Sequence, residues 1–137
     1  MKYKMLVTDD DPELLALYKS LFNCNYDLEV DFASTPEECR MLIKRNLYDL
    51  VLLDIYLTPG NPDGKDILSE MWKYPHTEAV MMSTCDDPKT VKECFELGAD
   101  EFISKNDQFI SSLQRCIAKR MSDTVARTLC YADVVNF

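Results

Sequence analysis

Three aspartates stand at the ends of predicted strands, at Asp9, Asp10 and Asp54. Two carboxylates about 4 Å apart repel each other by ~4 kcal/mol at an effective dielectric of 20. Three carboxylates at one edge of a sheet would therefore raise a pKa or recruit a cation. Magnesium suits such a site because it accepts a few carboxylates, keeps several waters and completes its shell with phosphate oxygens.

Two further strand ends deliver polar groups: Ser83-Thr84 in one case and Lys105 in the other. If a phosphoryl group were bound near the aspartates, the Lys105 ammonium would serve as its counter-charge. Asp11 needs no such role, because an N-cap position explains it. Asp54 is different, because it directly ends the apolar run LVLL.

Short apolar runs alternate with longer segments of helical spacing along the chain. In the first such segment, apolar side chains that include Leu14, Tyr18 and Phe22 share one helical face. The predicted strands are Lys4–Thr8, Leu28–Phe32, Leu50–Leu53, Val80–Ser83 and Glu101–Ile103.

Helix starts are marked by a capping residue before a proline, at Asp11-Pro12, Thr35-Pro36 and Asp87-Pro88. Thr35 and Glu38 have the spacing of a capping box. Gly98 is typical of a helix C-terminal cap.

Five strands that alternate with five helices predict an α/β fold, a parallel sheet covered on both faces. Leu50–Leu53 and Val80–Met82 are apolar on both sides, as interior strands are, whereas Leu28–Phe32 alternates, as an edge strand does. Ligands of such sheets bind beyond the carboxyl ends of the strands, where the strand order reverses. The aspartates lie at those ends.

Composition excludes several classes of function. A chain of 137 residues fits one domain, and a net charge of −9 argues against direct nucleic-acid binding. No C-x-x-C pair is present, and His76 has no Cys or His at metal-ligand spacing. No segment is suited to spanning a membrane, so a cytoplasmic protein with reduced thiols is expected. The cysteines are Cys24, Cys39, Cys85, Cys94, Cys116 and Cys130.

Three motifs occur in order: LVTDDDP, YDLVLLDIYL and MMSTCDDPKTVKECFELGADEFISK. Together they resemble the receiver domains of two-component response regulators, from about Lys2 to Met121. The resemblance implies a flavodoxin-like, doubly wound sheet of five parallel strands in the order 2-1-3-4-5, with helices on both faces. It assigns residues 1–121 to the receiver domain and residues 122–137 to a C-terminal extension, either a continuation of the last helix or the stub of a linker.

The resemblance also implies roles for individual residues. Asp9, Asp10, Asp54 and the backbone carbonyl of Tyr56 would hold Mg²⁺, and Asp54 would accept the phosphoryl group. Ser83 would bond a phosphoryl oxygen and Lys105 would pair with it. Ser83 lies 22 residues before Lys105, which favours Ser83 over Thr84 as the switch hydroxyl. Phe102 would be the aromatic that changes rotamer, and Thr84 and Cys85 would flank the site.

In this interpretation, the phosphoryl donor is a phosphohistidine on a sensor histidine kinase or a phosphotransfer protein. The expected consequence is a change in the face formed by the fourth helix, the fifth strand and the fifth helix. The chain would act as a signalling switch and not as an enzyme, although it would assist its own phosphorylation and slow autodephosphorylation.

Four features depart from the commonest receiver pattern. Asn106 follows Lys105 where proline is frequent, so a cis peptide bond is not expected there. The segment from Asp54 to Gly64 is about two residues longer than usual, Thr84 replaces a small residue, and residues 122–137 extend past the usual end.

Three other functions stay open. A magnesium-dependent phosphatase with an aspartate nucleophile would carry a second acid at the position of Tyr56. A flavodoxin-like cofactor binder would need a phosphate loop where TDDDP stands. A receiver-shaped interaction module that is never phosphorylated is the third alternative.

Overall fold

The computed structural model describes residues 2–23, 25 and 27–135, and their side chains as far as residue 123. The chain divides into two compact units, Met1–Ser104 and Lys105–Phe137. The first contains the sheet and four α-helices, and the second contains one long helix.

The order of elements is the alternation predicted from the sequence. The first unit comprises β1 (Tyr3–Thr8), α1 (Pro12–Phe22), β2 (Leu28–Ala33), α2 (Pro36–Arg45), β3 (Leu50–Asp54), α3 (Asp63–Glu70), a 3₁₀ turn (Met71–Lys73), β4 (Glu78–Ser83), α4 (Pro88–Glu96) and β5 (Glu101–Ser104). The second unit holds α5 (Phe109–Val135). The predicted strands are therefore right in number and place, and each of the five extends by one or two residues beyond its predicted range.

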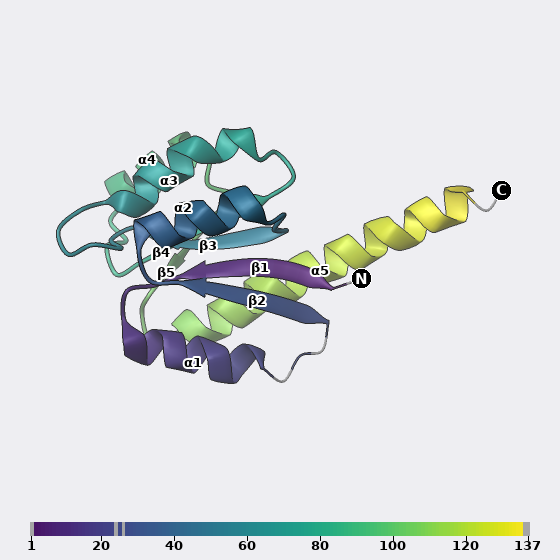
Figure 1. The fold of residues 1–137 in the computed structure, drawn as a ribbon, viewed down its shortest axis with the longest axis horizontal. Helices are drawn as coiled ribbons and strands as arrows, with labels where there is room; N and C mark the ends of the chain where they lie inside the picture. The colour runs from purple at the N-terminus through teal and green to yellow at the C-terminus, as the bar shows by residue number, and fades with distance from the viewer. Residues whose placement is uncertain (1, 24, 26, 136–137) are drawn as a thin grey trace. The chain divides into compact units, whose positions relative to one another are not determined.

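The five strands form one parallel sheet in the order β2-β1-β3-β4-β5, which confirms the predicted fold class. β2 is an edge strand, as its alternating pattern indicated, and β3 lies at the centre. In the first unit, α1 lies on one face of the sheet and α2, α3 and α4 lie on the other (Figure 1).

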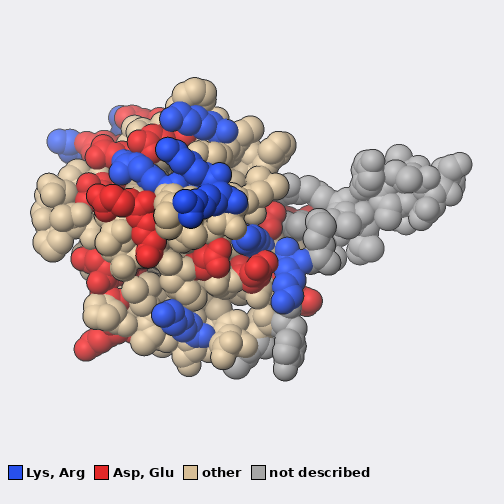
Figure 2. Space-filling model, viewed as in Figure 1, with Lys and Arg blue, Asp and Glu red and all other residues tan. Residues whose placement is uncertain are grey.

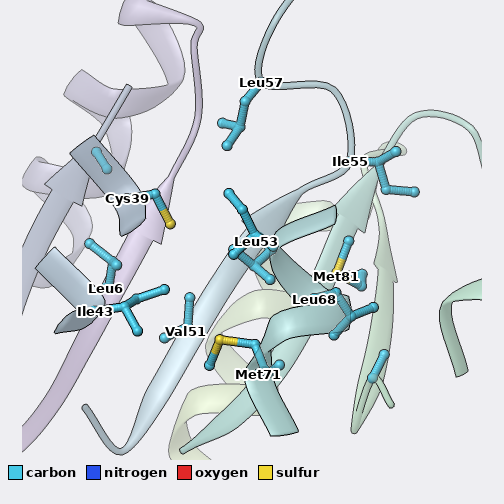
Figure 3. Close-up of a cluster of buried hydrophobic side chains, with 14 of the residues drawn as sticks. Leu6, Cys39, Ile43, Val51, Leu53, Ile55, Leu57, Leu68, Met71 and Met81 are labelled. Carbon is cyan, nitrogen blue, oxygen red and sulfur yellow. The ribbon is translucent and has the colours of Figure 1, made fainter. Parts of the chain in front are cut away.

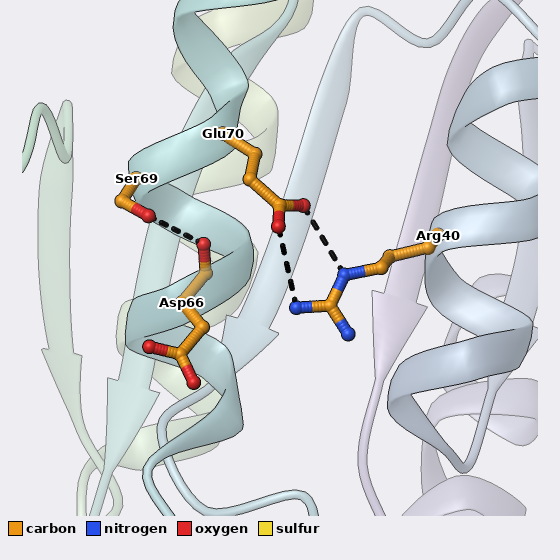
Figure 4. Close-up of polar contacts among 4 residues, drawn as sticks. All are labelled: Arg40, Asp66, Ser69 and Glu70. Atoms are coloured by element: carbon orange, nitrogen blue, oxygen red, sulfur yellow. Dashed lines mark hydrogen bonds and ion pairs between the residues drawn. The ribbon is translucent and has the colours of Figure 1, made fainter.

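The core of the first unit lies between the sheet and helices α2 to α4. All five residues of β3 are buried, because the strand has neighbours on both edges and helices on its faces. Figure 3 shows Leu53 and Val51 facing Ile43 of α2 and Leu68 of α3. An ion pair joins the same two helices at the surface, where Arg40 Nε lies 3.1 Å from a carboxylate oxygen of Glu70 (Figure 4).

The predicted caps are present at all three Pro-containing helix starts. Asp11, Thr35 and Asp87 each accept a backbone N–H of the first turn. The capping box differs in one bond, since the Glu38 carboxylate accepts from the backbone of Ser34 and not from Thr35. Gly98 follows α4 with a φ of 106°, a conformation that favours glycine, and caps the helix as predicted.

The second unit consists mainly of α5. This helix runs without interruption from Phe109 to Val135, across the boundary predicted at residues 121 and 122. Of the extension predicted for residues 122–137, the side chains beyond residue 123 lie outside the described part. Every peptide bond in the described residues is trans, including the one between Lys105 and Asn106. No helix in those residues is long and apolar enough to cross a membrane.

The described thiols divide into two groups. Cys39, Cys94 and Cys116 are buried, whereas Cys85 is exposed. Burial raises the pKa of the Cys39 thiol to about 12, which keeps it protonated and unreactive. The side chains of Cys24 and Cys130 lie outside the described residues.

Candidate functional site

Asp9, Asp10 and Asp54 meet at the carboxyl edge of the sheet. Each offers one carboxylate oxygen, and these oxygens all lie within 4.8 Å of one another. Asp9 is fully buried and Asp54 is 6% exposed, whereas Asp10 is open to solvent. Burial lowers the effective dielectric and strengthens the repulsion among the carboxylates, so the set is suited to a hard divalent cation reached from the side of Asp10.

A hydroxyl at the end of β1 fixes the spacing of the two strands that carry the acids. Thr8 donates its hydroxyl to the carbonyl of Leu52 at 3.0 Å and accepts the backbone N–H of Asp54 at 3.0 Å. Regular pairing between β1 and β3 reaches as far as Val7 and Leu52. Thr8 therefore extends the contact between the strands to the residue before Asp9. Sequence reasoning missed this role, although a polar residue ending an apolar strand was visible.

The carboxylate of Asp9 accepts hydrogen bonds at both of its oxygens. The backbone N–H of Asp11 donates to Oδ1 at 3.0 Å, and the hydroxyl of Tyr18 donates to Oδ2 at 2.8 Å. Burial, and then the negative charge of Asp9, raise the pKa of Tyr18 far above its usual range, so the phenol keeps its proton and remains a donor. From the sequence, Tyr18 was assigned only to the apolar face of α1.

The loop after β3 closes tightly against Asp54. The backbone N–H of Tyr56 donates to Asp54 Oδ1 at 3.2 Å, and that of Gly64 donates to the carbonyl of Ile55 at 2.9 Å. Gly60 has a φ of 79° in the turn from Thr58 to Asn61. Proline followed by glycine with positive φ is typical of a type II turn. Thr58 to Asn61 thus form a turn of their own within the loop.

Gly64 allows the loop to approach the strand. A Cβ atom at this position would overlap the backbone carbonyl of Asp54, which explains why only glycine fits. Beside it, Lys65 forms a 2.6 Å ion pair with Glu93 and so connects α3 to α4. Contacts therefore connect the segment after Asp54 both to the backbone of Asp54 and to α4.

Ser83 ends β4, the neighbour of the strand that carries Asp54. It is buried, and its hydroxyl accepts the backbone N–H of Cys85 at 3.0 Å. Thr84 and Cys85 are exposed beyond it. The loop is also bound to β5, because the hydroxyl of Ser104 donates to Asp86 at 2.6 Å.

Phe102 and Lys105 lie close together in the sequence, the first within β5 and the second just after it. Phe102 lies in β5 opposite Met81 of β4 and packs, partly buried, against the core cluster. Lys105 directly follows β5 and is the first residue of the second unit. The structure thus brings Asp9, Asp10 and Asp54 together, and it places Ser83 on the strand next to Asp54.

A parallel sheet in the order 2-1-3-4-5, with an acidic cluster at its carboxyl edge, defines a class of fold and site. The family model of the response regulator receiver domain matches residues 5–118, which is most of the chain. The chain therefore belongs to the response-regulator receiver family. Members of this family bind Mg²⁺ at an acidic aspartate cluster.

Individual relatives agree with this assignment. The transcriptional regulatory protein SrrA of Staphylococcus aureus is 26% identical over 141 residues, which cover 100% of this chain and 57% of SrrA. The chain thus spans little more than half the length of that curated relative.

Two solved structures share the fold. A CheY-like receiver domain protein from Methanospirillum hungatei JF-1 has a TM-score of 0.78 at 22% identity, over 92% of this chain and 99% of that one. The receiver domain of a putative Luxo repressor protein from Vibrio parahaemolyticus also has a TM-score of 0.78, at 18% identity, over 94% and 97% of the two chains.

The packing of Gly64 predicts an asymmetry between two glycines that follow β3, Gly60 in the loop and Gly64 in the first turn of α3. Gly64→Ala should lower the free energy of unfolding by about 2 kcal/mol or more, because the methyl group displaces the backbone of Asp54. Gly60→Asn is the control: nothing lies near its Cβ position and asparagine tolerates positive φ, so a loss below about 1 kcal/mol is expected. Urea unfolding measures both. Equal losses would contradict the close approach at Gly64.

Proposed function

We propose that this chain is a phosphorylation-dependent switch that accepts a phosphoryl group on Asp54 from a phosphohistidine. The donor is a sensor histidine kinase or a phosphotransfer protein in the cytoplasm. The observation that carries the proposal is the convergence of Asp9 and Asp10 on Asp54 at the carboxyl edge of the sheet. Asp9, Asp10, Asp54 and the backbone carbonyl of Tyr56 would hold Mg²⁺ there.

The chemistry requires little of the protein beyond position and charge. A carboxylate oxygen of Asp54 attacks phosphorus in line, the P–N bond to histidine breaks, and the imidazole leaves with the electron pair of that bond. When bound, Mg²⁺ would supply positive charge for the oxygens of the phosphoryl group being transferred. The N–H of Tyr56, which already donates to Asp54 Oδ1, orients the carboxylate for the attack.

Ser83 and Lys105 are the proposed sensors of the phosphoryl group. The Ser83 hydroxyl accepts from Cys85 and still carries a proton that it can donate to a phosphoryl oxygen. Lys105 adds a charge-assisted bond. Movement of Ser83 would make room for Phe102 and alter the face formed by α4, β5 and α5. A shift from 1:99 to 99:1 requires ~5.5 kcal/mol of differential binding.

We propose that the switch acts by binding a protein partner. SrrA, which is longer than this chain, is a transcriptional regulator by name. Here Lys and Arg side chains are interspersed with Asp and Glu on the face shown in Figure 2, and the net charge is −9. Direct nucleic-acid binding by this chain would call for a cluster of basic residues, so a protein partner is favoured.

Phosphorylation should be confined to Asp54 and depend on Mg²⁺. Incubation with acetyl phosphate and Mg²⁺ should add one phosphoryl mass to the wild type and none to Asp54→Asn, because the amide is not a nucleophile. Asp11→Asn, which keeps the N-cap, is the control and should be modified normally. Intact-protein mass spectrometry measures all three. Full modification of Asp54→Asn would refute the acceptor, and an unmodified wild type would favour the interaction-module alternative.

Lys105 should matter more for sensing the phosphoryl group than for holding Mg²⁺. In Lys105→Ala, beryllofluoride should still bind but produce much smaller amide shifts around Phe102 than in the wild type. Lys119→Ala removes an exposed lysine of the same unit and should behave as the wild type does. Two-dimensional NMR provides the comparison. Identical shifts in Lys105→Ala and wild type would mean that another group couples the site to Phe102.

The phosphoryl group on Asp54 should be long-lived compared with fast receivers. Hydrolysis needs a water in line with phosphorus, and Tyr56 and Cys85, two residues after Asp54 and Ser83, offer neither a carboxylate nor an amide to orient it. A cost of ~1.4 kcal/mol slows hydrolysis about tenfold. The bulky ring of Tyr56 would shield phosphorus from water. Tyr56→Ala removes this ring and should therefore lose phosphate faster, whereas Tyr56→Phe, which keeps the ring, should not. Decay measured in Mg²⁺ tests this, and equal rates for the alanine variant and wild type would exclude Tyr56 as the shield.

A further inference from the structure

We infer that Tyr18 is a positioning residue of the metal site, whose hydroxyl holds the carboxylate of Asp9 in the orientation that Mg²⁺ requires. The inference rests on the proposed function, since it takes Asp9 as a metal ligand. It assigns to helix α1 a direct part in the chemistry at the carboxyl edge of the sheet.

The geometry around Asp9 leaves its carboxylate little freedom. Its two oxygens accept from two different elements, Oδ1 from the backbone of Asp11 and Oδ2 from the hydroxyl of Tyr18 on α1. Both Asp9 and Tyr18 are fully buried, so water does not compete for the bond between them. A carboxylate held at both oxygens keeps one rotamer, so it presents a fixed orientation to a bound ion.

The ring of Tyr18 is itself fixed. It stacks on Phe22, one turn further along α1, with the ring centroids 6.4 Å apart and the planes inclined by 10°. Packing alone would be satisfied by phenylalanine or leucine at this position. A buried phenolic O–H needs an acceptor, and the acceptor here is one of the three clustered carboxylates. The hydroxyl therefore has a use that the apolar face of α1 does not explain.

Residues that orient a metal ligand typically affect metal affinity by 10- to 100-fold. The effect should also depend on the metal. Mg²⁺ demands near-ideal octahedral geometry, whereas Ca²⁺ accepts flexible and irregular coordination. Loosening Asp9 should therefore weaken Mg²⁺ binding more than Ca²⁺ binding. A loss of stability or of negative charge would instead affect both ions alike.

Tyr48 provides a matched control within the same unit. It is also buried, and its hydroxyl donates to a carboxylate oxygen of Asp31 at 2.6 Å. Asp31 lies in the edge strand β2 and is not a member of the acidic cluster. Tyr48→Phe thus removes the same kind of hydrogen bond as Tyr18→Phe, away from the three aspartates.

The experiment is a calorimetric titration of three proteins: wild type, Tyr18→Phe and Tyr48→Phe. Each is titrated with Mg²⁺ and, separately, with Ca²⁺. Tyr18→Phe should bind Mg²⁺ about tenfold more weakly than wild type, with a clearly smaller loss for Ca²⁺. Tyr48→Phe should match the wild type for both ions. Unchanged or tighter Mg²⁺ binding by Tyr18→Phe, or equal losses for Mg²⁺ and Ca²⁺, would overturn the inference.

Failure of the inference is distinguishable from failure of the proposed site. If wild type binds Mg²⁺ and Asp54→Asn does not, the site stands whatever Tyr18→Phe does. If Tyr18→Phe does not fold, a measurement on the wild type alone still tests the positioning role. Mg²⁺ should shift the ring resonances of Tyr18, assigned by through-bond NMR, more than those of Tyr48. A Tyr18 ring that does not respond to Mg²⁺ would overturn the positioning role.

Discussion

Mutual repulsion among the carboxylates of Asp9, Asp10 and Asp54 is the interaction on which the other features of the site depend. Their oxygens lie within 4.8 Å of one another, and two of the three residues are buried. At an effective dielectric of 20, each such pair costs about 3 to 4 kcal/mol when both groups are charged. A fold keeps such a cluster only if its backbone is well fixed and if a cation or a hydrogen-bond donor offsets the charge.

The surrounding structure supplies both forms of support. Thr8 joins the ends of β1 and β3, and Gly64 lets the following loop close against the backbone of Asp54. Tyr18 and the backbone of Asp11 donate to Asp9. Each of these contacts is local to the carboxyl edge, where the central strand β3 is held by neighbours on both sides. The site is therefore built beside the central strand of the sheet.

Much of this arrangement was predictable because it follows from local patterns. Apolar runs such as Leu50–Leu53 identified the interior strands, and the proline-containing caps identified three helix starts. Asp9 and Asp54 could be brought together because parallel strands deliver their ends to one edge.

The features that were missed depend on distances that no pattern encodes. Tyr18 fits the apolar period of α1 whether or not its hydroxyl reaches Asp9. Glu38 has the spacing of a capping box, yet its carboxylate accepts from Ser34, because a long side chain can reach either backbone N–H. The bond from Ser104 to Asp86 joins residues that are distant in sequence. Such contacts require the register of the strands and the rotamers of the side chains.

Thermal unfolding of Asp10→Asn, with and without Mg²⁺, tests the central role of carboxylate repulsion most directly. The substitution should have opposite effects on thermal stability, relative to wild type, in the two conditions, with Asp11→Asn as the neighbouring control. Without the cation, the variant should melt at a higher temperature than wild type, because one repelling charge is gone. With Mg²⁺, the wild type should gain stability by ligand linkage and the variant should gain little. An Asp10→Asn protein that is no more stable than wild type without Mg²⁺, and equally stabilised by it, would contradict the account.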